Sequence, residues 1–428
     1  MGVISIREKS YEKTKEKAKK IQSNGNTLFE IVDEIVQYLL KEKSKLIIDI
    51  QKELIKRKEL DDIVAEYIKA KNIVIDGIDS YEKIIDSVND YLWGYSVINK
   101  YIDDDLEVSD IAIKGTNDTW IKKNGIRTKT DIVFPSIQSI INFAYSIAIK
   151  NGGNLSKRDA VIVIGDYTSS KYYFLRIDIA ISPVNVISPH IIIRKIPKYI
   201  IKPDMDKLEY LKMFNSEMKN YLIKAFTKGK NILIVGQGAS GKTTLLNAGI
   251  EHIPESLSKL GIQEIMELSS GKGNWIWETV VKKSGEGDIE YTLQDLATNG
   301  LLIDIDWFLI GESKGAESMA LFDATFTGHK VALTAHAPSS KQGIEKVILN
   351  MKKSGTDYKR EDLLRMLSNL DIVIFTKKFK VCEITECVGY DEKANNLKYN
   401  PVFKFNIERD DELGIDGYFE KLNESCKI

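Results

Sequence analysis

A glycine-rich motif is the part of the sequence whose residue types and spacing point most directly to chemistry. Residues 236–243 read Gly-Gln-Gly-Ala-Ser-Gly-Lys-Thr, a complete G-x-x-x-x-G-K-[ST] pattern. Glycines let backbone N–H groups approach phosphate oxygens, and they leave the N-terminus of the next helix facing the anion. We expect the Lys242 ammonium to reach the β- and γ-phosphates of a nucleoside triphosphate and the Thr243 hydroxyl to bind Mg²⁺.

The residues on either side of this motif predict the strand–loop–helix context that it needs. Residues 231–235 (NILIV) form a short apolar run suited to a buried strand, and residues 244–250 (TLLNAGI) continue as a helix. The alternative is a chance match in a glycine-containing loop, which average residue usage produces with a probability on the order of a percent. We expect the following residues to contact the nucleotide: Gly236, Gln237, Gly238, Ala239, Ser240, Gly241, Lys242, Thr243 and Thr244.

Hydrolysis requires a carboxylate near the phosphates, and Glu312 is the candidate. It follows Gly311 and the apolar run WFLI (307–310), which predicts a buried strand with Glu312 at its C-terminal tip. Ligands bind at that edge of open α/β sheets. We expect Glu312 to orient or deprotonate the attacking water and to approach Mg²⁺, either directly or through a water molecule. The alternative is a glutamate that is merely solvated at a strand end.

Two of the four histidines, His329 and His336, fall in the short stretch 328–337. An imidazole at a strand end can hold or sense the γ-phosphate. A structural histidine that satisfies neighbouring backbone groups fits the same pattern. Without further context the sequence leaves both interpretations open.

Composition limits the class of protein. A chain of 428 residues predicts two or three domains, and a formal net charge of −1 gives no overall field to attract nucleic acid. Cys382, Cys387 and Cys426 fit a reducing compartment, and their spacing is poor for a zinc site. No apolar run reaches the roughly 18–20 residues of a membrane span, and the N-terminus lacks a secretory pattern. We therefore expect a soluble, cytosolic chain that can dock on a membrane complex.

Hydrophobic periodicity divides the chain into a helical region, a mixed domain, a linker and a second domain. Residues 1–90 predict charged helices, either a solvated bundle or an arm that docks a partner. Residues 91–197 predict an α+β domain, with strands at 109–115, 119–125, 160–165 and 172–181 and a helix at 137–153. Two nearby prolines, Pro197 and Pro203, predict an extended linker at 198–203.

Strands and helices alternate from residue 204 to residue 428. The strand candidates are NILIV (231–235), QEIMEL (263–268), WFLIG (307–311), VALTAH (331–336) and IVIFTK (372–377). Such alternation predicts an α/β domain with a mainly parallel sheet and helices on both faces.

Taken together, these motifs resemble those of the type II/type IV secretion system ATPases, most closely the CpaF-like branch that assembles Tad pili. The family runs from a phosphate loop through an Asp box and a Gly-Glu Walker B motif to a His box. The matching segments here are GQGASGKT (236–243), QEIMEL (263–268), FLIGE (308–312) and TGHKVALTAHA (327–337). The resemblance extends over residues 92–406, with further matches at 92–115, 191–195 and 381–389.

The resemblance implies a homohexameric ring that is cytoplasmic and peripheral to the inner face of the membrane, where it meets pilus or secretion platform proteins. A PAS-like domain would precede a RecA-like motor domain, with ATP and Mg²⁺ bound between the two. Nucleic acid is not an expected partner. By position, the implied site comprises catalytic Lys242, Glu312, His336 and Glu267 (or Glu264) as the Asp-box acid, with Arg176, Arg194 and His329 as further nucleotide contacts and Thr243 on the metal.

The sequence also departs from the family pattern. The usual Asp box, I-E-D-x-x-E-L, becomes QEIMEL and loses its acidic pair, so its register stays open. Leu302 and Asp304 replace arginines that precede Walker B, and Lys314 replaces the arginine that follows it. We expect these departures to bear on the catalytic rate and on the coupling between subunits, and not on nucleotide binding. They leave two alternatives open, a RecA-like nucleic-acid translocase and a weakly hydrolysing nucleotide-dependent scaffold.

Overall fold

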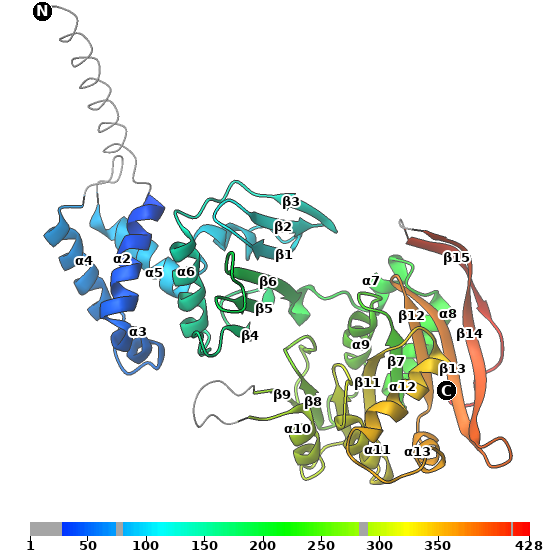
Figure 1. The fold of residues 1–428 in the computed structure, drawn as a ribbon. Coiled ribbons are helices and arrows are strands. Elements are labelled where there is room, and N and C mark those ends of the chain that lie inside the picture. The colour runs from blue at the N-terminus through cyan, green and yellow to red at the C-terminus, as the bar shows by residue number, and fades with distance from the viewer. Residues whose placement is uncertain (1–27, 74–79, 282–289, 412–413) are drawn as a thin grey trace, which may run out of the picture. The chain divides into compact units, whose positions relative to one another are not determined.

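The computed structural model describes residues 28–73, 80–281, 290–411 and 414–428. It divides the chain into two compact units, residues 1–195 and 196–428, each with its own sheet (Figure 1). Residues 1–27 and 74–79 of the predicted helical region lie outside the described residues. Among the residues that the structure does describe, no helix is both long and apolar enough to cross a bilayer.

The first unit combines helices with a six-stranded sheet in the order β3-β2-β1-β6-β5-β4. Its helices are α2 (Leu28–Glu42), α3 (Ser44–Gln51), α4 (Lys58–Lys71), α5 (Tyr81–Trp93), the short 3-10 helix η1 (Ser96–Tyr101) and α6 (Ile137–Lys150). Its strands are β1 (Val108–Ile113), β2 (Thr119–Lys123), β3 (Ile126–Lys129), β4 (Val161–Asp166), β5 (Tyr173–Ala180) and β6 (His190–Pro197).

Polar side chains fix where these helices begin and how they pack. Ser80 and Ser136 cap α5 and α6 by accepting backbone N–H bonds, which satisfies donors that a helix leaves free. The carboxylate of Asp33 on α2 is buried and accepts hydrogen bonds from Tyr91 Oη (3.1 Å) and Ser139 Oγ (2.6 Å). The first helices are therefore joined to the unit that carries the sheet, instead of projecting from it.

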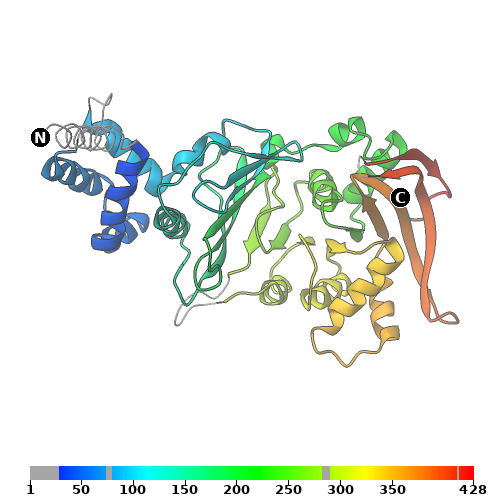
Figure 2. The same ribbon diagram turned by 45° about the horizontal axis from the view of Figure 1, so that its top comes forward.

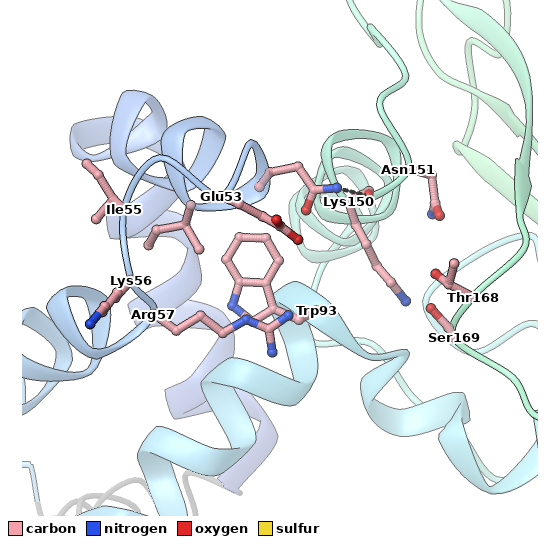
Figure 3. Close-up of a pocket in the computed structure, with 11 residues that line it drawn as sticks. Glu53, Ile55, Lys56, Arg57, Trp93, Lys150, Asn151, Thr168 and Ser169 are labelled. Atoms are coloured by element: carbon pink, nitrogen blue, oxygen red, sulfur yellow. Dashed lines mark hydrogen bonds between the residues drawn. The ribbon is translucent and has the colours of Figure 1, made fainter.

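A pocket of about 480 Å³ opens where the α3–α4 loop meets the ends of α5 and α6 (Figure 3). Arg57 lies over the ring of Trp93, and the Lys150 amine lies 3.2 Å from Asp166. Burial by itself would raise the pKa of Asp166, but hydrogen bonds from Ser169 and Tyr95 and the charge of Lys150 hold it well below its usual value. Lys150 is thus a buried cation with a buried carboxylate partner.

The second unit carries a nine-stranded sheet in the order β15-β14-β13-β12-β7-β11-β10-β8-β9. Its strands are β7 (Ile232–Gly236), β8 (Lys259–Gln263), β9 (Trp275–Thr279), β10 (Trp307–Ile310), β11 (Lys330–His336), β12 (Ile372–Lys377), β13 (Lys380–Asp391), β14 (Asn396–Asp411) and β15 (Gly414–Lys421). The pairings from β12 through β7, β11, β10 and β8 to β9 are parallel, whereas those among β12, β13, β14 and β15 are antiparallel.

Helices cover both faces of this sheet (Figure 2). Alternate residues of β7 enter two separate cores, because side chains of a strand point to opposite faces in turn. Helices α10 (Leu293–Gly300), α11 (Glu317–Phe326), α12 (Ser340–Lys352) and α13 (Arg360–Leu367) contribute to one core. The other core takes α7 (Met205–Tyr210), α8 (Ser216–Thr227) and α9 (Lys242–Ile250), which follow the 3-10 helix η2 (Tyr199–Ile201). The predicted α/β class is confirmed.

One predicted strand is wrong. The segment 263–268 leaves the sheet, since β8 ends at Gln263. The reason is local: the Gln263 side-chain oxygen accepts the backbone N–H groups of Glu267 (2.8 Å) and Leu268 (2.7 Å), which turns the chain back on itself. We call residues 264–269 the Asp-box loop.

Candidate nucleotide site

The phosphate loop leaves strand β7 and enters helix α9 under tight steric limits. A Cβ at Gly236 would lie 2.3 Å from the carbonyl oxygen of Thr376, so only glycine fits at that position. Gly241 has φ of 97°, a left-handed conformation that glycine adopts without strain. The Ser240 hydroxyl lies 2.9 Å from the Thr376 hydroxyl and ties the loop to β12. The middle of the loop is exposed to solvent at Gln237, Gly238 and Ala239.

Helix α9 presents an unblocked N-terminus and a buried amine to this loop. Gly241 is the N-cap residue and offers no side-chain acceptor to the first-turn N–H groups. Lys242 is 6% exposed, and its Nζ donates to the carbonyls of Gly236 (3.1 Å) and Gln237 (2.8 Å). Burial lowers the pKa of Lys242, while the charges of Glu312 and Glu267 oppose that change. Thr243 and Thr244 are half-buried in the first turn of α9.

The parallel strands bring the other candidate residues to the same edge. His336, the last residue of β11, pairs in register with Gly236 of β7, and Ile310 of β10 pairs with Ile262 of β8. Residues just after β10 and β8 therefore lie along the same edge of the sheet as the phosphate loop. The Thr334 hydroxyl donates to the carbonyl of Gly311 (2.7 Å) and fixes the chain as it leaves β10.

Glu312 is held by two cationic or potentially cationic side chains. His336 Nε2 lies 2.9 Å from one carboxylate oxygen, and Lys314 Nζ lies 3.3 Å from the other. Burial lowers the pKa of His336 and the Lys242 charge adds to that effect, with Glu312 opposing both. A neutral His336 can then donate its Nε2–H to Glu312, which fixes the orientation of the carboxylate.

Lys314 joins the ends of β8 and β10. Its Nζ contacts Glu264 (3.1 Å) as well as Glu312, and these two partners raise the pKa of Lys314 although its partial burial acts the other way. A lysine can bridge two carboxylates as a point charge, without the planar fork of the arginine that the sequence comparison anticipated here.

The Asp-box loop brings Glu264 and Glu267 to the site in different ways. Glu264 reaches the Lys314 bridge, whereas the Glu267 carboxylate acts on Lys242 through its charge. The Glu267 carbonyl accepts hydrogen bonds from Asn247 Nδ2 (3.0 Å) and Lys202 Nζ (2.9 Å). The conformation of this loop is set by Gln263, whose amide also donates to the carbonyl of Leu268 (3.1 Å).

Lys202 and Gln263 were not predicted as parts of the site. Gln263 appeared only as a departure from the acidic pattern. Lys202 lies in the run YIIKP (199–203). A lysine between apolar residues and a proline was the only feature of the sequence that could have indicated a buried amine there.

The three remaining predicted residues are one histidine of this unit and two arginines of the first unit. His329 precedes β11, at the opposite end of that strand from His336, and its Nδ1 contacts Thr327 Oγ1 (2.7 Å) and the carbonyl of Ala324 (3.1 Å). Arg176 on β5 and Arg194 on β6 belong to the first unit, where Arg194 Nε donates to Asp110 (3.1 Å). We therefore leave His329 out of the site.

The residues at this edge fit a magnesium nucleotide. The glycine cradle and the free end of α9 suit phosphate oxygens, and Thr243 and Glu312 supply the oxygen ligands that Mg²⁺ prefers. Over the residues that the structure describes, no group of three or more His, Cys, Asp or Glu side chains is arranged to hold a metal ion.

Comparisons with known proteins agree with the motifs. The family described as type II/IV secretion system protein matches residues 169–390. An uncharacterized protein of Methanocaldococcus jannaschii is 32% identical over 196 residues, which cover 45% of this chain and 72% of that one. The type IV secretion system protein VirB11 of Bartonella quintana is 31% identical over 178 residues, or 40% of this chain and 50% of that relative.

The chain therefore spans half of the length of VirB11. Among solved structures, the X-ray structure of the Legionella pneumophila ATPase DotB has a TM-score of 0.49 and 18% identity, covering 68% of this chain and 79% of that one.

Proposed function

The chain belongs to the type II/IV secretion system protein family, whose members are ATPases, and we propose that its second unit hydrolyses ATP with Mg²⁺ to drive the assembly of a pilus or the export of a substrate. The observation that carries the proposal is the convergence of a buried Lys242 and the Glu312–His336 pair at one edge of a parallel sheet. This combination provides both phosphate binding and a carboxylate for water.

Each side chain has a role that its surroundings support. Lys242 exchanges its two loop carbonyls for phosphate oxygens, so its charge meets the negative charge that develops on the leaving phosphates. Glu312 orients the attacking water and accepts its proton, while His336 keeps the carboxylate in place. Thr243 and Glu312 would hold Mg²⁺, which neutralises phosphate charge when it is bound.

The first unit has a proposed role of its own. We assign residues 91–197 to a PAS-like domain and residues 204–428 to a RecA-like motor, joined by the linker at 198–203. Arg176 and Arg194 are proposed to neutralise phosphate charge in an assembled ring of six copies. A CpaF-like role in Tad pilus assembly, at the cytoplasmic face of the membrane, is the specific assignment that we favour.

The test is release of inorganic phosphate by the purified chain. We expect turnover of ATP in Mg²⁺, none after the metal is chelated, and a fall of about a thousandfold in Lys242→Ala, because the variant lacks the cation on the transferring phosphoryl group. Undiminished turnover in Lys242→Ala would refute the assignment of the site. Stimulation by DNA would favour a translocase instead, and nucleotide binding without phosphate release would favour a scaffold.

A further inference from the structure

Lys202 connects three segments that are distant in the sequence. Its Nζ donates to Asn247 Oδ1 on helix α9 (2.9 Å), to the carbonyl of Glu267 (2.9 Å) and to Ser269 Oγ (2.8 Å). An ammonium has three N–H donors, so each one has an acceptor. The lysine itself lies immediately after η2, at the end of the linker.

Asn247 completes the same network from the side of the phosphate loop. Its amide nitrogen donates to the carbonyl of Glu267 (3.0 Å), and its oxygen accepts the backbone N–H of Ser269 (3.2 Å). Asn247 is 6% exposed and stands in helix α9, which Lys242 begins. A shift of the Asp-box loop would therefore also displace helix α9, whose first turn we propose to bind phosphate.

The linker also packs against the residues that follow this loop. A Cβ at Gly271 would lie 2.8 Å from the ring of Tyr199, so the two segments approach as closely as a glycine permits. Tyr199 and Lys202 also line a pocket of about 460 Å³ together with residues of α9. The charged and titratable groups around Lys202 are Glu251 and His252 at the end of α9, Glu267 and Lys272 near the loop, and Asp204.

We propose that Lys202 is a positioning residue, which holds the Asp-box loop and helix α9 in the arrangement that catalysis requires and links both to the linker. The inference rests on the proposed function, because it concerns the same nucleotide site. Burial lowers the pKa of Lys202 to about 7, although the charges of Glu251 and Glu267 act the other way. Hydrogen bonds in such surroundings are strong, so the three bonds can fix the loop.

Lys259 provides a matched control in the same unit. It is 1% exposed, and its Nζ donates to the carbonyls of Leu257 (2.8 Å), Pro254 (3.3 Å) and Glu255 (3.4 Å). It begins β8, whereas the Asp-box loop follows the end of that strand. Lys259 thus resembles Lys202 in its burial and its hydrogen bonds, but it lies at the start of β8, away from the site. Its replacement tests the effect of losing a buried lysine as such.

The experiment compares Lys202→Met, Lys202→Arg and Lys259→Met by steady-state ATP hydrolysis, nucleotide affinity and thermal unfolding. We expect Lys202→Met to lower kcat about tenfold with little change in nucleotide affinity, because a misplaced group affects the reaction more than binding. Lys202→Arg, which keeps the charge and several donors, should recover part of that loss. Lys259→Met should lose thermal stability but keep its kcat.

An unchanged kcat in Lys202→Met, or an equal fall in Lys259→Met, would overturn the inference. Should Lys202→Met fail to fold, Ser269→Ala removes one acceptor with less disturbance, and an unchanged kcat in that variant has the same meaning. The proposed function fails separately, through Lys242→Ala: if that variant is inactive while Lys202→Met is fully active, only the role of Lys202 is refuted.

Discussion

The parallel strands of the nine-stranded sheet begin at one edge, the amino edge, and end at the other, the carboxyl edge. The two edges carry similar side chains, but these side chains make different contacts. At the amino edge, His329 contacts Thr327 and a backbone carbonyl, and Lys259 donates to three backbone carbonyls. At the carboxyl edge, His336 and Lys314 pair with the carboxylates of Glu312 and Glu264. Residue type alone therefore does not mark a site. What marks it is pairing between ionisable side chains beside an open helix N-terminus.

The largest effect expected within this comparison comes from Glu312. In Glu312→Gln the amide cannot accept the proton of the attacking water, so we expect kcat to fall roughly a hundredfold. Binding of ATP should persist, since the phosphate loop is unchanged. Equilibrium binding of a fluorescent ATP analogue and single-turnover hydrolysis measure the two properties. Turnover at the wild-type rate would remove Glu312 from its proposed role.

The two histidines offer a paired test of the edges. We expect His336→Ala to lower kcat about tenfold, because Glu312 loses the donor that orients it. His329→Ala should keep kcat within about twofold and lose about 1 kcal/mol of unfolding free energy with its hydrogen bonds. Steady-state kinetics and denaturant unfolding of both variants provide the comparison. The reverse pattern would show that the functional edge has been misassigned.

The smallest effect expected is a pH dependence of stability that arises from Lys202. Its folded pKa of about 7 lies below the roughly 10.4 of an unfolded lysine, so between these values the unfolded chain binds more protons. The free energy of unfolding should therefore rise with pH, by about 2 kcal/mol from pH 7 to pH 9. Urea unfolding of the wild type and of Lys202→Met across this range measures the difference. Parallel curves would contradict the lowered pKa.

The sequence predicted the parts of the site that depend on local pattern. Gly236 to Thr243 contains its own turn and helix start, and WFLI followed by Gly311-Glu312 defines a strand end, so both could be placed without tertiary information. The separation of His329 from His336 follows from the intervening β11, which was itself predicted, although the two histidines were treated together.

The remaining features depend on contacts between distant segments. The turn after Gln263 is made by a side chain that accepts two backbone N–H groups, which strand propensity does not reveal. The acceptors of Lys202 are 45 to 67 residues away from it in the sequence, and no local pattern predicts contacts over such separations. The lysine bridge at Lys314 likewise required the ends of β8 and β10 to be adjacent.

The bonds of Gln263 also predict how the Asp-box loop responds to ionic strength. The bonds that shape the Asp-box loop from within join an uncharged amide to backbone groups, so dissolved ions do not screen them. The contacts of half-exposed Lys314 with Glu264 and Glu312 are screened, since the Debye length shrinks to roughly 3 Å at 1 M salt. In concentrated salt the loop should thus keep its shape while the bridge beside it weakens.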